Sequence, residues 1–451
     1  MFEKIIDIIN SYLWSLPMII LLFGTHIFLT FSLKFPQRKL LTAIKLSFTS
    51  DKDAKGDVSQ AKALVTSLAA TIGTGNIIGV GTAIALGGPG AVFWCWLAGI
   101  FGIATKYSES LLAVKFRRKS STGEMLGGPM IALENGLGMK WLAVLFAIFT
   151  ALATFGIGNT VQSNAITTIL YEGVGVSPYL SSAIITILVA LVIMYGIKGI
   201  TKVCSILVPF MVLIYVIGCI IILYINSEFL GEAISLIFTE AFKLEAIGGG
   251  AVGGGILMAA RYGIARGLFS NEAGMGSAPI LSAAAKTNNP VRQALVSSTA
   301  TFWDTVVVCA LTGIVLVSSI IANPEIDYSD GALLTKLAFE KIPYIGNFIL
   351  TIAICTFCFS TIIGWYVYGE KAIEYLGGGR KFIKVYRWIN IIVCYIGGII
   401  QLTLVWSLAD MMNALMAIPN LISLLLLHKI IVKETNHYLW QGNLNKINSE
   451  D

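Results

Sequence analysis

The chain has 451 residues, of which 56% are hydrophobic and only 12% are charged, and its formal net charge is +6. A soluble domain carries roughly 25% charged residues, so this composition excludes an ordinary water-soluble protein and indicates a chain solvated mostly by the lipid bilayer. The seven cysteines lie in apolar stretches, which excludes the disulfide framework of a small secreted domain. The positive charge indicates no nucleic-acid partner, because its distribution over the loops follows membrane topology.

Long stretches without Asp, Glu, Lys or Arg predict membrane-spanning helices of about 20 residues each. The first stretch, residues 8–33, is too long and too poorly flanked for a signal peptide, so we interpret it as a retained helix. The predicted helices cover about residues 13–34, 59–86, 89–114, 141–171, 178–197, 201–225, 248–284, 292–320, 345–376, 384–401 and 403–428. The alternating pattern of an outer-membrane barrel is absent. The fold class is therefore all-α: a polytopic membrane protein with eleven transmembrane helices.

The basic residues support this count and predict its orientation. Of the 31 Lys and Arg residues, 24 fall in alternate loops and in the tail, whereas only 4 fall in the opposite loops. Since basic loops gather in the cytoplasm, the N-terminus is predicted outside and the C-terminus inside, in the plasma (inner) membrane of a prokaryote. The predicted segments are a leading helix with a basic loop (1–58), a five-helix repeat (59–225), an extracellular amphipathic connector (226–247), a second repeat (248–428) and a cytoplasmic tail (429–451). Because each repeat has five spans, the second is inverted relative to the first.

Glycine clusters with Thr, Ser and Asn interrupt the first helix of each repeat, at residues 73–76 and 269–274. Each glycine weakens a helix interior by about 1 kcal/mol, and unwound backbone at membrane depth is costly unless it lines a cavity or binds something. Its free N–H groups favour a carboxylate, and its free C=O groups favour Na⁺ or an ammonium. Matched interruptions in inverted halves predict a transporter site at the repeat interface. The glycines of residues 248–255 are instead typical of tight helix packing.

Five stretches around these interruptions resemble the alanine or glycine:cation symporter family: residues 71–81 (TIGTGNIIGVG), 127–133 (GGPMIAL), 155–164 (FGIGNTVQSN), 269–279 (FSNEAGMGSAP) and 359–370 (FSTIIGWYVYGE). The resemblance implies a leucine-transporter-like fold, with a leading helix ahead of a five-plus-five inverted-repeat core. It also implies Na⁺-coupled uptake of a small neutral amino acid, alanine or glycine. No cofactor beyond the coupling ion is implied, and the absence of a Walker A lysine motif argues against ATP as a partner.

The resemblance carries a substrate site onto the two interruptions. Backbone amides and the Thr74 hydroxyl of the first would hold the substrate carboxylate; the residues are Gly73, Thr74, Gly75 and Asn76. Carbonyls of the second would take the ammonium while its side chains line the pocket; the residues are Phe269, Ser270 and Asn271. Trp365 resembles the family's pocket tryptophan and would limit substrate size, with an ordinary core or belt tryptophan as the alternative.

The resemblance also implies a sodium site between the first and eighth core helices. Its ligands would be the carbonyls of Ala69, Ile72 and Phe357 and the hydroxyls of Ser360 and Thr361. Oxygen ligands suit a hard cation. In the alternative, the two hydroxyls bond only to carbonyls of their own helix.

Polar and charged residues within the predicted spans are further candidates. Asn159 and Gln162 are three residues apart and predicted on one face; together with Asn164 they would bind substrate or tie helices together. Glu272 would shape the pocket, couple protons or pair with an arginine such as Arg266, and Asp304 is predicted to pair with an arginine across the bundle.

The leading function is a secondary symporter that works by alternating access around a midplane site. One alternative is a proton-coupled transporter of the same fold. Only one of the three histidines, His26, lies within a span, which argues against a histidine proton relay. A channel lacks support because we find no symmetric filter or charge ring, and no catalytic motif indicates an enzyme. Alanine and glycine differ by one methyl, worth roughly 1–3 kcal/mol, so the sequence does not separate them.

Overall fold

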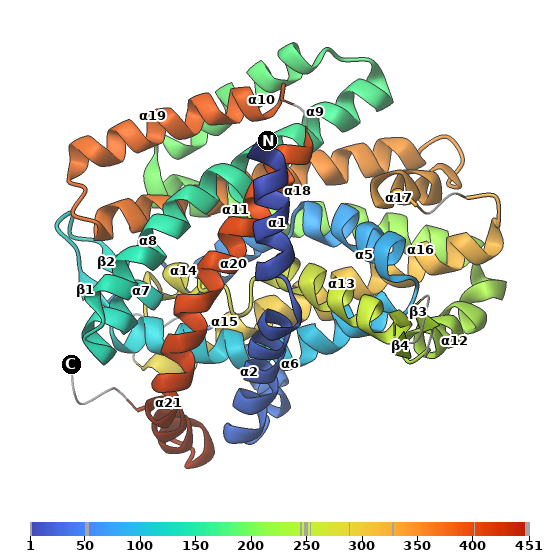
Figure 1. Ribbon diagram of the computed structural model, residues 1–451. Coiled ribbons are helices and arrows are strands. Elements are labelled where there is room, and N and C mark those ends of the chain that lie inside the picture. Colours follow the sequence, from blue (N-terminus) through green and yellow to red (C-terminus); the bar gives the residue numbers. More distant parts are fainter. Residues whose placement is uncertain are drawn as a thin grey trace.

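The computed structural model describes residues 2–49, 54–243, 246–247, 251–252, 254–287, 289–326, 329–400 and 402–446. The secondary structure of these residues is almost entirely helical (Figure 1), which confirms the all-α prediction. Five single helices and two bent helix pairs are long and apolar enough to cross a membrane. The protein is therefore a multi-pass membrane protein, while eleven spans, their orientation and the repeat boundaries stay predictions.

The first half of the chain contains α1 (Phe2–Leu13), α2 (Leu16–Ser32), η1 (Pro36–Lys39), α3 (Leu40–Ser47), α4 (Gln60–Thr71), η2 (Gly75–Gly79), α5 (Val80–Gly87), α6 (Ala91–Lys115), α7 (Pro129–Ile131), η3 (Ala132–Gly136), α8 (Lys140–Phe155), η4 (Gly156–Thr160), α9 (Val161–Val174), α10 (Pro178–Ile193) and α11 (Gly196–Ile225). Of these, η2, η3 and η4 are π-helical turns. The predicted leading helix corresponds to α2, and a separate helix that was not predicted, α1, precedes it.

The second half contains η5 (Ser227–Phe229), α12 (Leu230–Ala241), α13 (Gly254–Asn271), α14 (Pro279–Ala283), α15 (Pro290–Thr301), η6 (Phe302–Cys309), α16 (Ala310–Ala322), α17 (Gly331–Glu340), α18 (Gly346–Tyr375), α19 (Arg380–Gly397), α20 (Leu402–Leu426), α21 (His428–Thr435) and η7 (Asn436–Trp440). Two short antiparallel pairs join β1 (Arg118–Lys119) to β2 (Met125–Leu126) and β3 (Ala246–Ile247) to β4 (Ala251–Val252).

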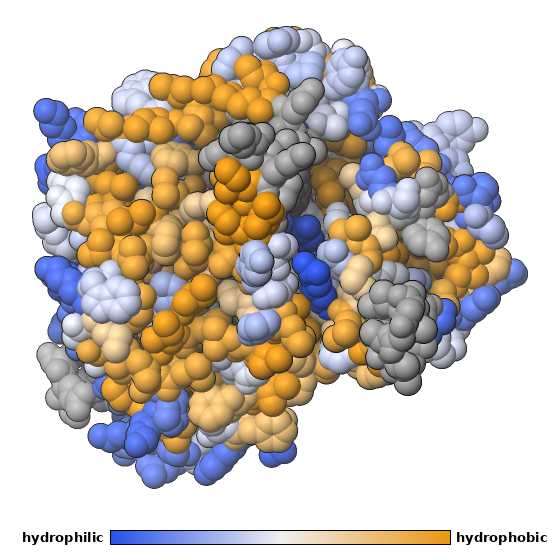
Figure 2. Space-filling view, viewed as in Figure 1, coloured by the Kyte–Doolittle hydropathy of each residue, from blue (hydrophilic) through white to orange (hydrophobic). Residues whose placement is uncertain are grey.

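Most of the long helices run across the view of Figure 1, with β1 and β2 at one end and α12 and α17 at the other, while α20 runs steeply down it. Apolar residues cover much of the intervening face in Figure 2. On α10, Leu180, Ile184, Ile187 and Leu191 repeat at helical spacing and are all exposed. Such a stripe is costly in water and suits contact with lipid.

The first interruption lies where the sequence predicts it. Helix α4 ends at Thr71, Ile72 adopts an extended conformation, and the chain becomes helical again at Gly75. The two halves are bent by 55°. This turn packs closely against α18 and needs glycine there, because a Cβ atom on Gly73 would lie 2.5 Å from the Thr361 hydroxyl oxygen.

The second interruption begins three residues later than predicted, because α13 continues through Asn271 and so includes Phe269 and Ser270. Glu272 takes a left-handed conformation with φ of 57°, and the Asn271 carboxamide accepts a hydrogen bond from the amide of Ala273 at 2.8 Å. An asparagine side chain that satisfies an amide just beyond a helix end is a common way to stop it. Residues 248–250 and 253 of the predicted glycine packing run lie outside the described residues.

Two long helices position these interruptions. Helix α6 packs against α13 and α15, and α18 packs against α4, α8, α9 and α11. The approach of α18 to α4 is tight, because a Cβ atom on Gly364 would lie 2.8 Å from the Ala70 Cβ atom.

Candidate substrate and sodium sites

The five predicted sodium ligands converge where α4 ends against α18. The Ser360 hydroxyl lies 3.0 Å from the Ala69 carbonyl oxygen and 2.8 Å from that of Phe357. The Thr361 hydroxyl lies 3.3 Å from the carbonyl oxygens of Ala69 and Ile72 and 3.0 Å from that of Phe357. These are five oxygen–oxygen contacts, but two hydroxyls supply only two protons. A cluster with more lone pairs than protons fits a small hard cation.

The amides of the first interruption already have side-chain partners. The Gly73 amide donates to the Asn76 carboxamide oxygen at 2.9 Å, and the Thr74 amide donates to the Gln162 carboxamide oxygen at 3.3 Å. The Gln162 NH₂ group donates in turn to the Thr74 hydroxyl at 3.1 Å. Gln162 therefore presents an oxygen to the N–H group where a substrate carboxylate was predicted, and a bound substrate has to share or displace that contact.

Asp304 of η6 joins the two interruptions. Its carboxylate accepts hydrogen bonds from the side-chain NH₂ group of Asn76 at 2.7 Å, the Ser270 hydroxyl at 2.8 Å and the Thr305 hydroxyl at 2.7 Å. Asn271 donates to the same Thr305 hydroxyl at 3.0 Å. The predicted pairing of Asp304 with an arginine is wrong, because the hydrogen bonds described for this carboxylate come from neutral donors.

We expect Asp304→Asn to weaken binding of alanine, one of the two substrates that the resemblance implies, by about tenfold or more. An amide in place of the carboxylate turns an NH₂ group toward at least one existing donor, and an unsatisfied buried donor costs roughly 1–3 kcal/mol. Equilibrium binding of radiolabelled alanine and the thermal unfolding midpoint measure the two effects. Glu325→Gln is the matched control because the Glu325 side chain is largely exposed. Equal binding by both variants would remove Asp304 from the site.

The polar stretch on η4 and α9 divides between two neighbours. Asn159 donates to the carbonyl and side-chain oxygens of Asn390 on α19, at 2.8 and 2.9 Å, whereas Gln162 faces the first interruption. Asn164 donates to the carbonyls of Gly397 and Ile400. The predicted common face of Asn159 and Gln162 is wrong, because the π-helical turn is wider than an α-helical one. Asn159 and Asn164 thus tie helices together.

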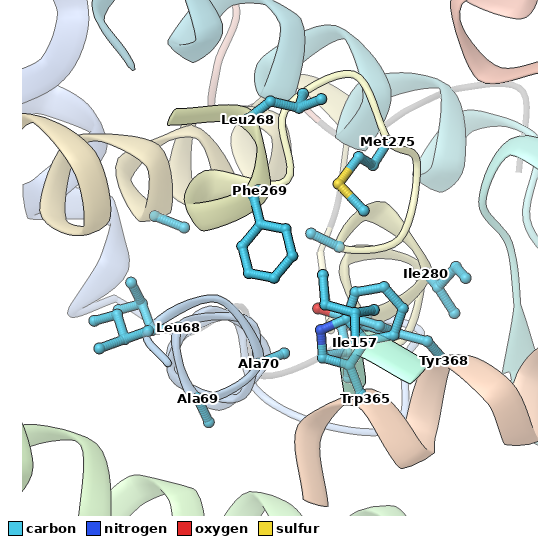
Figure 3. Close-up of a cluster of buried hydrophobic side chains, with 14 of the residues drawn as sticks. Leu68, Ala69, Ala70, Ile157, Leu268, Phe269, Met275, Ile280, Trp365 and Tyr368 are labelled. Carbon is cyan, nitrogen blue, oxygen red and sulfur yellow. The ribbon is translucent and has the colours of Figure 1, made fainter. Parts of the chain in front are cut away.

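Phe269 and Trp365 enclose the region between the interruptions (Figure 3). Phe269 points toward the turn of α4 that carries Ala70, and Trp365 lies beside Ile157 and Tyr368. Both aromatic side chains are buried. A Cβ atom on Gly75 would lie 3.1 Å from the Phe269 ring, so the helix that resumes after the first interruption touches the last turn of α13 at this point.

Glu272 and Glu109 hold the unwound segment after α13. Glu272 accepts from the Ser277 hydroxyl at 2.6 Å, and its predicted arginine partner is absent from its described contacts. Glu109 of α6 accepts from the amides of Gly274 at 2.9 Å and Gly276 at 3.1 Å, and from Asn420 at 2.6 Å. Neither Glu109, which sequence spacing would pair with Lys106, nor Asn420 was among the predicted site residues. A carboxylate in the middle of a predicted span was the available signal.

Comparison with known proteins decides the family. A family model described as the sodium:alanine symporter family matches residues 1–450. The chain belongs to this family. The sodium/alanine symporter AgcS of Methanococcus maripaludis is 47% identical over 97% of both chains. The protein named probable sodium/glutamine symporter GlnT of Bacillus subtilis is 35% identical over 98% of this chain and 92% of its own. The family's members in this comparison are transporters.

Solved structures show the fold of this symporter-family chain. MhsT in complex with L-phenylalanine superposes with a TM-score of 0.57 over 81% of this chain and 89% of its own, at 14% identity. A Na⁺-coupled sialic acid symporter in a substrate-bound outward-open state gives 0.56 over 87% and 82%, at 13% identity. These likenesses confirm the leucine-transporter-like fold; at such identities they carry no information on substrate.

Two cavities of this family member lie away from the end that carries β1 and β2. One, of about 480 Å³, lies between α1, α13 and α20, where Figure 2 shows a hydrophilic recess. The other, of about 440 Å³, lies between α5, α9, α17 and α18. Arg266 lines both cavities, forms an ion pair with Asp410 at 3.8 Å and stacks over the Phe269 ring at 5.7 Å. Asp410 was not among the predicted site residues.

The opposite end is closed by main-chain hydrogen bonds between the segments that flank the two interrupted helices. The amide of Asp57 donates to the Ala284 carbonyl at 2.8 Å, and the Lys286 amide donates to the Val58 carbonyl at 2.7 Å. Burial raises the pKa of the Asp57 carboxyl, against the opposing effect of the amide that it binds.

Arg117 adds a clamp to this closure. Its guanidinium donates to the carbonyls of Ala283 at 3.0 Å and Ala285 at 2.7 Å, and to that of Lys55 at 3.1 Å. One side chain thus bonds to both flanking segments. We call residues 55–58 and 283–286 together with Arg117 the inner clamp.

Proposed function

We propose that this chain is a sodium-coupled symporter that takes up a small neutral amino acid, alanine or glycine, by alternating access. The observation that carries the proposal is the five-oxygen cluster formed by residues 69, 72, 357, 360 and 361. It uses the unwound end of α4 as well as α18, so an ion bound there stabilises the first interruption in one conformation. That conformation is the one that presents Thr74 and its neighbours to the substrate.

Two close approaches support a small substrate. Gly75 contacts Phe269, and Gly158 approaches Trp365 so closely that a Cβ atom would lie 2.5 Å from the Trp365 Cβ atom. The names of the family relatives, a sodium/alanine symporter and a probable sodium/glutamine symporter, support an uncharged amino acid, and the first of these names supports alanine.

Alternating access is proposed from the contrast between the two ends of the molecule. The end with the two outer cavities is hollow down to Phe269, and the Arg266–Asp410 pair crosses it at 3.8 Å. The hydrogen bonds of the inner clamp close the opposite end. We infer an outward-facing arrangement in which substrate enters past Arg266 and leaves when the clamp opens.

Sodium-dependent binding tests the proposal without requiring a complete transport cycle. Radiolabelled L-alanine is titrated onto the purified protein in sodium chloride and, separately, in choline chloride. Because coupling of two ligands is reciprocal, we expect Na⁺ to raise alanine affinity by about tenfold, and alanine to raise Na⁺ affinity equally. Equal alanine affinity in both salts would contradict sodium coupling.

Trp365→Ala is expected to widen the range of accepted amino acids. Removing the buried indole leaves a cavity between α18 and η4, and a longer side chain gains contacts there that alanine does not make. Competition of glutamine and phenylalanine against radiolabelled alanine measures the change. Trp388→Ala on α19 is the control, since that side chain is exposed. An unchanged set of competitors in a folded Trp365→Ala protein would remove Trp365 from the pocket.

A further inference from the structure

The connection between α6 and α7 forms a short hairpin at the same end of the molecule as the inner clamp (Figure 1). Strands β1 and β2 pair antiparallel, with Arg118 opposite Leu126 and Lys119 opposite Met125. Residues 120–124 connect the two strands, and we call residues 118–126 the hairpin strap. A Cβ atom on Gly123 would meet nothing within 4 Å, so the tip of the turn is free, and the contacts of the strap lie on either side of it.

The strap contacts both segments of the inner clamp. On the first segment, the Asp57 carboxylate accepts a hydrogen bond from the Met125 amide at 2.8 Å. On the second segment, the chain directly after the strap packs against α14: a Cβ atom on Gly127 would lie 2.5 Å from the Ala283 Cβ atom. The same Cβ atom would lie 2.5 Å from the Ala113 carbonyl oxygen of α6. The strap therefore spans the two segments whose mutual hydrogen bonds close this end.

Helix α18 holds the strap from the other side through side chains. The Lys371 ammonium donates to the Glu124 carboxylate of the strap at 2.6 Å and to the Glu374 carboxylate of its own helix at 2.9 Å. The Thr122 hydroxyl of the strap donates to the other oxygen of Glu374. The side chains of Lys371 and Glu374 are almost fully buried, whereas that of Glu124 is 40% exposed. Water competes for the bond of an exposed carboxylate, so the contact between Glu124 and Lys371 can break while α18 stays in place.

The charges at this junction include more acids than bases. Among the described residues they are Asp57, Arg117, Glu124, Lys371 and Glu374. Glu370 also lies within electrostatic reach of Lys371, but its own partner is Arg387 at 4.0 Å. Of the two bases, Lys371 is the one that joins the strap to α18. If Glu124 leaves, Lys371 keeps Glu374, so release of the strap leaves no buried ammonium without an acid.

We propose that the hairpin strap holds the inner clamp closed, and that release of Glu124 from Lys371 is the step that lets the clamp open. The two clamp segments cannot separate unless the strap gives up its contact with one of them. While α18 holds the strap in place, that separation also has to break the bonds of Lys371 and Thr122. Once Glu124 is released, the strap can move with one segment. This inference rests on the proposed alternating access, because it assigns the contact that controls one of its two openings.

The test measures opening of the clamp in the full chain in nanodiscs. A cysteine introduced by Ala285→Cys is buried while the clamp is closed, so its rate of reaction with a membrane-impermeant maleimide tracks opening. Six native cysteines are buried and Cys355 is partly buried, and the protein without the introduced cysteine gives the background rate. We expect Glu124→Gln to raise the labelling rate by about tenfold, because a charge-assisted hydrogen bond is lost. Glu172→Gln is the matched control, since Glu172 is a similarly exposed acid that pairs with Lys336 at 3.1 Å near α17, at the other end.

Two further variants show whether the effect passes through this one contact. Thr122→Val removes the second bond to α18 and should raise the labelling rate in the same direction. Lys371→Gln should also raise it, and adding Glu124→Gln to Lys371→Gln should raise it no further, since both act on the same pair. The proposal is overturned if Glu124→Gln labels no faster than Glu172→Gln, or if the effects of Glu124→Gln and Lys371→Gln multiply. The labelling requires neither sodium nor alanine, so equal alanine affinity in both salts would contradict sodium coupling and leave this test intact.

Discussion

Thr361→Ala is expected to abolish concentrative alanine uptake at moderate sodium concentration while leaving the fold intact. The Thr361 hydroxyl contacts the carbonyl oxygens of Ala69, Ile72 and Phe357, so its removal takes one ligand from the proposed ion and loosens the other contacts. Loss of one good oxygen contact is worth roughly 1.4 kcal/mol or more, which corresponds to about a tenfold weaker affinity for sodium. Uptake into proteoliposomes as a function of external sodium measures the shift, and Ser360→Ala should shift it in the same direction.

Thr356→Ala provides the matched control on the same helix. The Thr356 hydroxyl bonds to the carbonyls of Ile352 and Ala353 at 2.7 and 3.1 Å, within α18 itself. Thr356→Ala therefore removes a hydroxyl of the same kind whose described hydrogen bonds do not reach α4. If Thr356→Ala and Thr361→Ala show the same sodium dependence, the hydroxyls of α18 serve only their own helix, as the alternative from the sequence holds.

Gly56→Ala is expected to disrupt the inner clamp and to lower alanine uptake by about tenfold or more. Gly56 has a φ of 152°, and a Cβ atom there would lie 2.5 Å from the Lys286 amide nitrogen and 2.6 Å from the Ala285 carbonyl. The strained φ alone costs about 1–3 kcal/mol, and the overlap falls on backbone, which cannot rotate away. Since we propose that the clamp stabilises the conformation that is closed toward the cytoplasm, its loss should deplete the state that accepts external substrate.

Gly123→Ala separates loss of the clamp from loss of backbone freedom. Gly123 also has a positive φ, of 90°, in the nearby turn between β1 and β2, but a Cβ atom there would meet nothing within 4 Å. Maleimide labelling of Ala285→Cys in each background reports the clamp directly. We expect faster labelling with Gly56→Ala and an unchanged rate with Gly123→Ala. Equal rates would show that the clamp does not control access from this end.

The sequence was most informative where one property set the structure. Charge-free length located the apolar helices, and the glycines at 73 and 75 located the first interruption. The oxygen cluster between α4 and α18 could also be predicted from the sequence, because the resemblance covers both stretches and the helix geometry then brings the five atoms together.

The sequence was less informative where local hydrogen bonds or helix width set the structure. The second interruption starts at Glu272, since the Asn271 side chain satisfies an amide beyond the helix end. Gln162 and Asn159 point to different neighbours because Asn159 lies in a π-helical turn and Gln162 in the α-helix that follows it, and composition does not predict a π-helical turn. The partners of Asp304 and Glu109 come from distant helices, so only the tertiary packing determines them.

The central claim is that the ion held between α4 and α18 drives accumulation of the amino acid. Its most direct test is uptake of radiolabelled alanine into proteoliposomes under an inward sodium gradient, compared with an inward proton gradient in sodium-free buffer. We predict concentrative uptake with the sodium gradient only, and its loss in Thr361→Ala. Concentrative uptake driven by protons in the absence of sodium would contradict the account and would move the coupling to a buried carboxylate such as Glu272.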